Sequence, residues 1–433
     1  MGSSINIALP SIGKELSMDA ILLSWVSISF ILTAAMFLVP VGRIADIYGR
    51  NKIFKCGILV YTVFSLFSAI SNSAFALISF RLLQGVGGAM IFGTGIAILT
   101  SVFPANERGK ALGINVAAVY LGLSLGPFLG GFLTQHLGWR SIFLANVPLG
   151  LLMIVLVLWK LKGEWADAKG EKFDFIGSLI YSLTLIAIMY GFSLLPSMSG
   201  ACLISAGLLS MLVFFKWEMK TNNPLIDINL FRNNRTFAFS NMAALIHYCA
   251  TFAVSFLLSL YLQYIKGVSP QNAGLILVSQ PVVMTVFSPF AGRLSDTIEP
   301  RIVASTGMAL TAIGLLIFIF LNEKTTVEFI ILGLIILGIG FALFSSPNAN
   351  AIMSSVERKF YGVASGTLGT MRLVGQMLSM GIAVLIFAIY IGRVQITPEY
   401  HTLFLKSMKA AFTVFAILCF IGIFASLTRG KIR

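Results

Sequence analysis

Long apolar runs separated by short polar loops occupy almost all of the 433 residues of this chain. A helix that crosses a bilayer needs about 20 predominantly apolar residues. Thirteen runs come close to or exceed that length: 22–42, 52–70, 75–101, 108–133, 139–160, 174–195, 200–218, 237–265, 271–292, 301–321, 327–349, 360–391 and 404–427. Each run predicts a membrane-spanning helix, so we expect an all-α membrane protein.

A shorter apolar fragment, Ile5 to Ile12, precedes the first of these runs. It is too short to span a bilayer. We interpret it as the outer half of a first helix whose inner half is missing, which gives fourteen spans. The alternative is thirteen spans, with the fragment lying in the membrane interface.

Composition supports this assignment and excludes other classes. Hydrophobic residues make up 58% of the chain and charged residues only 11%, whereas soluble domains have about 25% charged residues. The four cysteines lie singly in apolar runs, and the sequence contains neither a His/Cys metal spacing nor a GxxxxGK[ST] phosphate loop. The spans also hold no nucleophile–base set, so we expect no enzyme activity and no cofactor.

Positive charge predicts the orientation of the spans. Lysine and arginine gather in alternate loops, around residues 43–55, 108–110, 160–172, 216–235, 293–301 and 358–359, and in the C-terminal tail. The loops on the other side carry only Lys14, Arg140, Lys266, Lys324, Arg393, Lys406 and Lys409. Since cytoplasmic loops are the ones rich in lysine and arginine, the first set is expected to be cytoplasmic. The net charge of +14 is then explained by topology and anionic lipid, and we expect no nucleic-acid partner.

The chain divides into two bundles of six spans with an extra pair between them. Residues 1–162 form the first bundle, with an incomplete first helix. Residues 163–235 form a polar linker, an extra transmembrane hairpin and a connector, with an interfacial helix expected around Leu225 to Phe231. Residues 236–433 form the second bundle and a short basic tail.

A repeat supports this division. Gly42, Arg43 and Asp46 recur as Gly292, Arg293 and Asp296, and the pair Glu107-Arg108 recurs as Glu357-Arg358, all at an offset of 250 residues. Internal repeats of multi-helix halves are a known transporter architecture. We interpret Gly42 to Arg50 as a small charged turn between two spans.

These features resemble the major facilitator superfamily, and specifically its fourteen-span drug:proton antiporter branch. Gly42 to Lys52 (GRIADIYGRNK) resembles the signature loop between the second and third helices. Arg81 to Ala89 (RLLQGVGGA) resembles the fourth-helix arginine motif, and Ile5 to Pro10 (INIALP) resembles the end of the first-helix motif. The antiporter motif G-x8-G-x3-G-P-x2-G-G is matched at Gly113, Gly122, Gly126, Pro127, Gly130 and Gly131.

The resemblance implies roles for the charged turns. We expect a latch that holds the two bundles together on the cytoplasmic side and opens as they rock. The alternative is that the turn only fixes topology. The candidate residues of this cytoplasmic gate are Gly42, Arg43, Asp46, Gly49, Arg50, Gly292, Arg293 and Asp296.

Two arginines inside apolar runs are candidates for a coupling or substrate cavity. A buried guanidinium is costly in hydrocarbon and usually faces the bundle interior or water, although Arg81 is close enough to a span end to reach the outer surface instead. Gln84 and Gln376 follow Arg81 and Arg372 at i+3 and i+4, so each pair shares a helix face. A structural hydrogen-bond network between helices is the alternative for Arg372 and Gln376.

The antiporter-motif glycines predict close helix packing. Gly122, Gly126 and Gly130 recur at i, i+4 and i+8, which lets helix backbones approach, and Pro127 removes one backbone hydrogen bond. His247 is the histidine that lies well inside a span, where it could carry protons. A lone histidine is more often a packing residue.

One departure from the family pattern concerns energy coupling. The resembled branch carries an aspartate nine residues before the proline that matches Pro10, and here that position is Met1. No acid is central in an apolar run. Three interpretations stay open: a start upstream of Met1, coupling through another site, or a transporter that does not exchange protons.

We therefore expect a secondary active transporter that exports lipophilic or cationic small molecules by proton antiport and alternating access. The alternative is an exporter of an endogenous metabolite, an organic anion or a peptide on the same fold. A membrane sensor or scaffold that does not transport is a third class, and no appended soluble domain or long tail supports it. We expect the protein to act as a monomer in the plasma membrane, driven by the proton gradient. Both termini would be cytoplasmic if the first helix is completed upstream.

Overall fold

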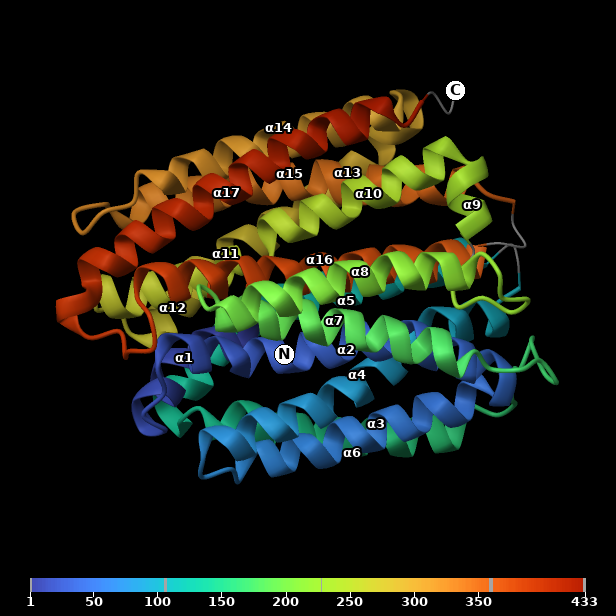
Figure 1. Cartoon of the computed structure of the whole chain (residues 1–433), viewed down its shortest axis with the longest axis horizontal. Coiled ribbons are helices and arrows are strands. Elements are labelled where there is room, and N and C mark those ends of the chain that lie inside the picture. Colours follow the sequence, from blue (N-terminus) through green and yellow to red (C-terminus); the bar gives the residue numbers. More distant parts are fainter. Residues whose placement is uncertain (1, 105–106, 227, 358–360, 431–433) are drawn as a thin grey trace.

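Helices account for nearly all of the secondary structure in the computed structural model of the chain (Figure 1), which describes residues 2–104, 107–226, 228–357 and 361–430. Met1 and Arg358 therefore lie outside the described residues. The α-helices are α1 (Gly2–Glu15), α2 (Ala20–Tyr48), α3 (Arg50–Ala69), α4 (Ala74–Val102), α5 (Arg108–Leu137), α6 (Arg140–Lys160), α7 (Phe175–Leu194), α8 (Met198–Glu218), α9 (Ile228–Asn233), α10 (Arg235–Thr251), α11 (Ala253–Leu260), α12 (Pro270–Leu277), α13 (Ser279–Thr297), α14 (Pro300–Ile319), α15 (Val327–Ser354), α16 (Tyr361–Tyr390) and α17 (His401–Thr428). A π-helical turn, η1 (Tyr261–Ile265), follows α11, and a 3-10 turn, η3 (Pro398–Tyr400), precedes α17.

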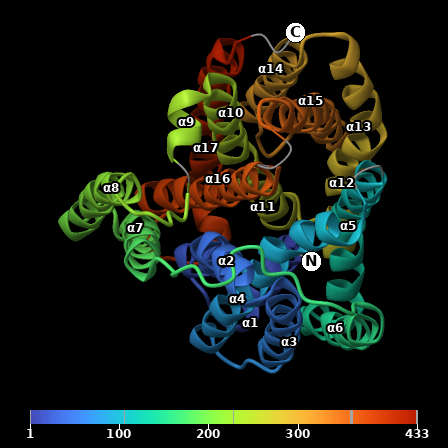
Figure 2. The ribbon, with the colours of Figure 1, turned by 90° about the vertical axis from the view of Figure 1, so that its right-hand side faces the viewer.

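The helices form two bundles with a hairpin beside them. Seen along the helix axes, α1–α6 gather on one side and α10–α17 on the other, while α7 and α8 stand apart (Figure 2). In the first bundle α4 packs against α2 and α3, and in the second α14 packs against α15 and α17. The bundles meet where α5 packs on α12 and α13, and where α16 packs on α2.

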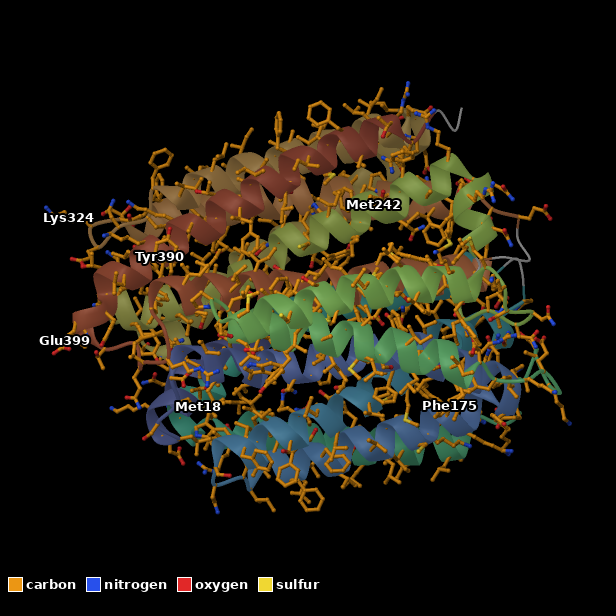
Figure 3. All side chains as sticks on the ribbon, viewed as in Figure 1. Met18, Phe175, Met242, Lys324, Tyr390 and Glu399 are labelled. Carbon is orange, nitrogen blue, oxygen red and sulfur yellow. The ribbon has the colours of Figure 1, made fainter. Side chains whose placement is uncertain are left out.

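The long sides of the molecule are apolar and its two ends are polar (Figure 3). Within the described residues, thirteen helices are long and apolar enough to cross a membrane. We call the end that carries Gly49 and residues 161–174 the basic face. The end that carries Glu15, Lys324 and Glu399 is called the opposite face (Figure 3). The expected all-α membrane architecture is confirmed.

The N-terminal fragment is part of the bundle core. The side chains of Ile7, Leu9 and Ile12 are almost fully buried, and α1 packs against α5 and α11. The fragment is thus packed within the protein, but α1 is not among the thirteen helices of the described residues that are long and apolar enough to span a membrane, so the fourteenth span stays a prediction. The fragment's apolar residues pack inside the protein because small serines at its start fit against glycines of α5.

Two expected spans are broken helices. The span expected at 237–265 is divided at Phe252, where the backbone N–H of Ala253 donates to Ser379 Oγ of α16 at 3.0 Å. The span expected at 271–292 is divided at Val278, just before Pro281, which lacks the N–H that would continue the helical hydrogen bonds. The expected interfacial helix is also shorter and begins later, as α9.

The charged segment Gly42 to Arg50 is mostly helix rather than a turn. Helix α2 continues through Tyr48, and α3 begins at Arg50. The change of direction falls on Gly49, whose φ of 120° is a conformation that side-chain-bearing residues rarely adopt. Gly292 to Asp296 likewise belong to α13.

Arg429, the first basic residue of the expected C-terminal tail, is buried. Arg429 donates to Asn348 Oδ1 at 2.8 Å and to the carbonyl oxygen of Pro300 at 2.9 Å. Burial lowers the pKa of Arg429 to about 10. Its guanidinium thus joins α10, α14 and α15 at the basic face of the second bundle.

The extra hairpin is held by close backbone contacts. A Cβ on Gly207 would lie 2.7 Å from Ile188, and one on Gly200 would lie 2.8 Å from the carbonyl oxygen of Gly191. Helix α7 also reaches the first bundle, since the Tyr181 hydroxyl donates to the carbonyl oxygen of Ala35 at 3.1 Å. The hairpin is therefore attached to both bundles through α7, which packs on α2 and α16.

Candidate functional site

Near the opposite face, the antiporter-motif glycines of α5 pack against α12 of the second bundle and against α1 of the first. A Cβ on Gly131 would lie 2.5 Å from the carbonyl oxygen of Pro270, at the start of α12, and one on Gly130 would lie 2.6 Å from Ser4 Cα of α1. Gly126 faces Ser3 in the same way, and Ser4 Oγ donates to the Gly126 carbonyl oxygen at 2.7 Å. Only glycine allows backbones to approach this closely.

The other half of α5 has no such contacts. A Cβ on Gly113 or Gly122 would meet nothing within 4 Å. From Gly113 to Leu125 no residue of α5 is buried, whereas Gly126, Pro127, Gly130 and Gly131 are. The two bundles are therefore sealed against each other at the opposite face and separated along α5 toward the basic face.

A polar network that the sequence interpretation missed strengthens the seal. Asn6 Nδ2 of α1 donates to Ser255 Oγ of α11 at 3.2 Å, and the Ser27 hydroxyl of α2 donates to Asn6 Oδ1 at 3.1 Å. The Ser259 hydroxyl donates to the Asn6 carbonyl oxygen at 2.7 Å. The sequence feature that could have predicted this network is Asn6, a polar residue inside an apolar fragment.

Arg81 faces the interior of the first bundle, not its surface. Only 3% of its surface is exposed, and its Nε donates to the Val26 carbonyl oxygen at 3.1 Å. Its Nη1 donates to Gln84 Oε1 at 2.5 Å, and Gln84 Nε2 donates to Ser65 Oγ at 2.5 Å. The guanidinium carbon lies 4.6 Å from the centre of the Phe30 ring, a favourable cation–π distance. The predicted pair of Arg81 and Gln84 thus joins α2, α3 and α4.

Polar side chains of both bundles meet near the middle of α5. Tyr120 Oη donates to Ser345 Oγ of α15 at 3.4 Å, and Ser124 Oγ lies 3.3 Å from Thr285 Oγ1 of α13. In the second bundle, the guanidinium carbon of Arg372 lies 5.6 Å from the centre of the Tyr248 ring. We call these six residues the central polar group; Gln376 is half-buried one turn further along α16.

His247 lies behind this group. It is fully buried, and its ring stacks on Phe344 with ring centres 4.0 Å apart. Neither ring nitrogen has a hydrogen-bond partner among the residues that the structure describes. The structure therefore places His247 in an aromatic cluster of the second bundle, next to Tyr248 but away from the surface between the bundles.

The charged residues at the end of α2 bind the polar linker. Arg50 pairs with Asp46 at 2.7 Å and with Asp167 at 2.8 Å, and Arg43 pairs with Glu171 at 2.5 Å. The linker residues were not predicted as part of this site, because the sequence of a short acidic segment does not indicate which part of the protein it contacts. The role of these residues as a gate between the bundles stays a prediction.

The linker also makes neutral contacts with the start of α3. The Asn51 amide donates to the carbonyl oxygens of Leu161 and Gly163, at 3.2 and 2.6 Å, and its backbone N–H donates to Glu164 Oε1 at 2.8 Å. In the second half of the repeat, Arg293 and Asp296 are exposed. The two halves of the repeat therefore differ in what covers them.

Comparison with known proteins identifies relatives over the whole chain. The Major Facilitator Superfamily model matches residues 1–222 and 241–431. The riboflavin transporter RibZ of Clostridioides difficile is 30% identical over 425 residues, which cover 98% of this chain and 92% of the relative. The multidrug resistance protein Stp of Mycobacterium tuberculosis is 30% identical over 387 residues, covering 88% and 71%. A crystallised peptide transporter, POT, has the same fold, with a TM-score of 0.70 at 15% identity, covering 99% and 92%.

Proposed function

Because this chain belongs to the major facilitator superfamily and is a multi-pass membrane transporter of that family, we propose that it exports lipophilic or cationic small molecules in exchange for protons. The observation that carries the proposal is the asymmetry of α5, which is sealed against the second bundle at one end and free of it at the other. Two bundles that rock about a central site produce alternating access in this way.

The basic face is cytoplasmic in this proposal, because it carries most of the lysines and arginines in short loops. The structure is then the inward-facing state, ready to receive a substrate from the cytoplasm or the inner leaflet. The protein acts as a monomer in the plasma membrane, with lipid as its other partner. No part of the transport path needs a second copy.

The central polar group is the proposed substrate site. It combines aromatic rings, small hydroxyl groups and one half-buried arginine from both bundles. Rings and a few polar groups suit lipophilic molecules with planar parts. One relative is named as a riboflavin transporter, whose substrate has a planar ring system, and another as a multidrug resistance protein.

A second candidate is the export of an organic anion or an endogenous metabolite. Arg372 is the observation that favours it, because a half-buried guanidinium at the site attracts negative charge. Arg81 does not serve this purpose, since it is buried inside the first bundle, where its Nε and Nη1 donate to Val26 and Gln84. In this case, too, the proton gradient supplies the energy.

Transport into inside-out vesicles separates the two candidates. The vesicles are loaded at acidic pH, diluted into neutral buffer, and offered ethidium or a sulfonated anionic dye. Drug export predicts ethidium uptake that collapses when a protonophore is added. Uptake of the anionic dye alone would refute it and favour the second candidate.

The variant Arg372→Ala tests the site itself. Removing the guanidinium removes a positive charge that attracts the anionic dye and repels ethidium, so uptake of the anionic dye should fall while uptake of ethidium should not. Arg393→Ala removes an exposed arginine outside the site and should leave uptake unchanged. Equal uptake of the anionic dye by both variants would exclude Arg372 from the substrate path.

A further inference from the structure

The base of the extra hairpin contains two buried acidic side chains that the transport path does not use. Asp174 directly precedes α7, and Glu218 ends α8, so the two meet at the basic face. Figure 3 labels the neighbouring Phe175 at this end of the molecule. Asp174 is 8% exposed and Glu218 is 3% exposed.

Three of the four carboxylate oxygens have hydrogen-bond donors. Asp174 Oδ1 accepts from the Gly177 backbone N–H at 2.9 Å, and Asp174 Oδ2 accepts from Trp217 Nε1 at 2.9 Å. Glu218 Oε2 accepts from the Ile226 backbone N–H at 3.0 Å. Glu218 Oε1 is buried and has no partner among the described residues.

Gly177 brings the two carboxyl groups together. A Cβ at this position would lie 2.7 Å from Glu218 Oε1 and closer still to Asp174 Oδ2. Both oxygens therefore lie over one glycine, and the charge of Asp174 acts on Glu218. The Glu218 oxygen without a donor is one of these two.

Neither acid is neutralised by a cation. Across the described residues, none of the ion pairs includes Asp174 or Glu218. The nearest cations along the chain, Lys172, Lys216 and Lys220, are exposed. Among the neighbouring elements, the start of α7 supplies the charged group that acts on Glu218, which is Asp174. The connector after α8 supplies backbone N–H groups that donate hydrogen bonds to Glu218. Two ionised carboxylates buried side by side are strongly disfavoured.

We propose that Asp174 and Glu218 form a proton-binding pair, in which Glu218 Oε1–H donates to Asp174 Oδ2 and one proton is shared. The proton removes one negative charge and gives the fourth oxygen its partner. Such a pair titrates as a unit. Glu218 Oε2 keeps its hydrogen bond from the Ile226 backbone N–H in either protonation state, so the pair links the end of α8 to the connector that leads to α9.

The proposal does not depend on which substrate is carried or in which direction. The hairpin base lies outside the central polar group, so the pair can hold its proton even if the protein does not exchange protons. The experiments below therefore use the purified full chain in lipid nanodiscs and measure no transport. Their failure would leave the proposed function untouched.

Infrared spectroscopy detects the shared proton directly. At neutral pH the wild type should show the carbonyl stretch of a protonated carboxylic acid, and Glu218→Gln should lack it. Glu399→Gln, which changes an exposed acid at the opposite face, should keep it. Identical spectra for the wild type and Glu218→Gln would overturn the proposal.

Unfolding in denaturant provides a second measurement. The native pair keeps a proton that the unfolded carboxylates, with pKa values of about 4, have already released at neutral pH, so wild-type stability falls as pH rises. Above the unfolded pKa and for as long as the native pair holds its proton, the unfolding constant of the wild type should rise by up to about tenfold per pH unit relative to Glu218→Gln. A matched pH dependence, or stabilisation by sodium that Glu218→Gln abolishes, would overturn the shared proton.

Discussion

The sharpest prediction concerns two glycines of the same motif, Gly131 and Gly113, each changed to alanine. The Cβ of Gly131→Ala would lie 2.5 Å from the Pro270 carbonyl oxygen and 3.0 Å from Gln271 Cα. Both atoms belong to the backbone, so they cannot move aside as a side-chain end would. The Cβ of Gly113→Ala would meet nothing within 4 Å.

The expected size of the effect follows from overpacking. Inserting a methyl group into a tightly packed contact costs about 1–3 kcal/mol, which changes a conformational equilibrium by about 5- to 150-fold. Both variants also gain up to about 1 kcal/mol of helix propensity, so this contribution cancels in the comparison. Because the strain exists only while Gly131 packs against α12, Gly131→Ala should shift the protein toward the state that is open at the opposite face.

Spin labels at Lys14→Cys and Lys324→Cys measure this shift, since both positions are exposed at the opposite face and belong to different bundles. The exposed cysteines Cys56 and Cys202 are first replaced by serine. Gly131→Ala should add a population with a longer distance between the labels, and Gly113→Ala should match the parent. Equal distance distributions for the two variants would refute the argument that close packing at Gly131 controls the closed state.

The remaining predictions concern single contacts. Arg81→Met removes two buried hydrogen bonds of a charged group and leaves Gln84 Oε1 without its donor, so it should lower the free energy of unfolding by about 2–4 kcal/mol, measured in denaturant. Leu83→Met, at an exposed neighbouring position, should change it little. Asp46→Asn should lower the free energy of unfolding more than Asp167→Asn, because the Asp46 side chain is 34% exposed and the Asp167 side chain 70%. The loss for Asp167→Asn should be less than about 0.5 kcal/mol. Thermal unfolding at low salt measures both losses, and the reverse order would contradict the prediction. Hydrogen bonds from Arg140 and Trp139 hold the pKa of Glu15 below its usual 4.5. The stability advantage of the wild type over Glu15→Gln should therefore be complete above pH 4.5 and disappear as pH falls through the lowered value, which melting curves at several pH values would test.

Much of the architecture could be predicted from the apolar runs alone. A bilayer leaves helices as the way to satisfy backbone groups, so run length predicted the thirteen long apolar helices; the fourteenth span and the orientation from loop charge stay predictions. Pro281 even carried the signal for the break between α12 and α13. The break at Phe252 had no such signal, because it depends on a serine of α16 that lies more than a hundred residues away.

The candidate site was predicted less completely. The spacing of Gly122, Gly126 and Gly130 indicated a shared helix face, but only the structure shows that Gly126 and Gly130 meet α1 while Gly122 meets nothing. Arg81 could be identified as unusual from its place in an apolar run. Its direction depends on Val26 and Ser65, which come from other helices.

The sequence by itself determined that the chain crosses the membrane many times, that its halves repeat, and that it resembles one transporter superfamily. These properties depend on local composition and on short motifs, which each segment carries alone. Only the tertiary structure decided which end of the two bundles is sealed, that the linker covers the arginines of α2, and that Asp174 and Glu218 share one buried space. Such properties depend on distances between segments far apart in the chain, and in a protein whose spans are all apolar helices, hydrophobic periodicity says little about which helices meet.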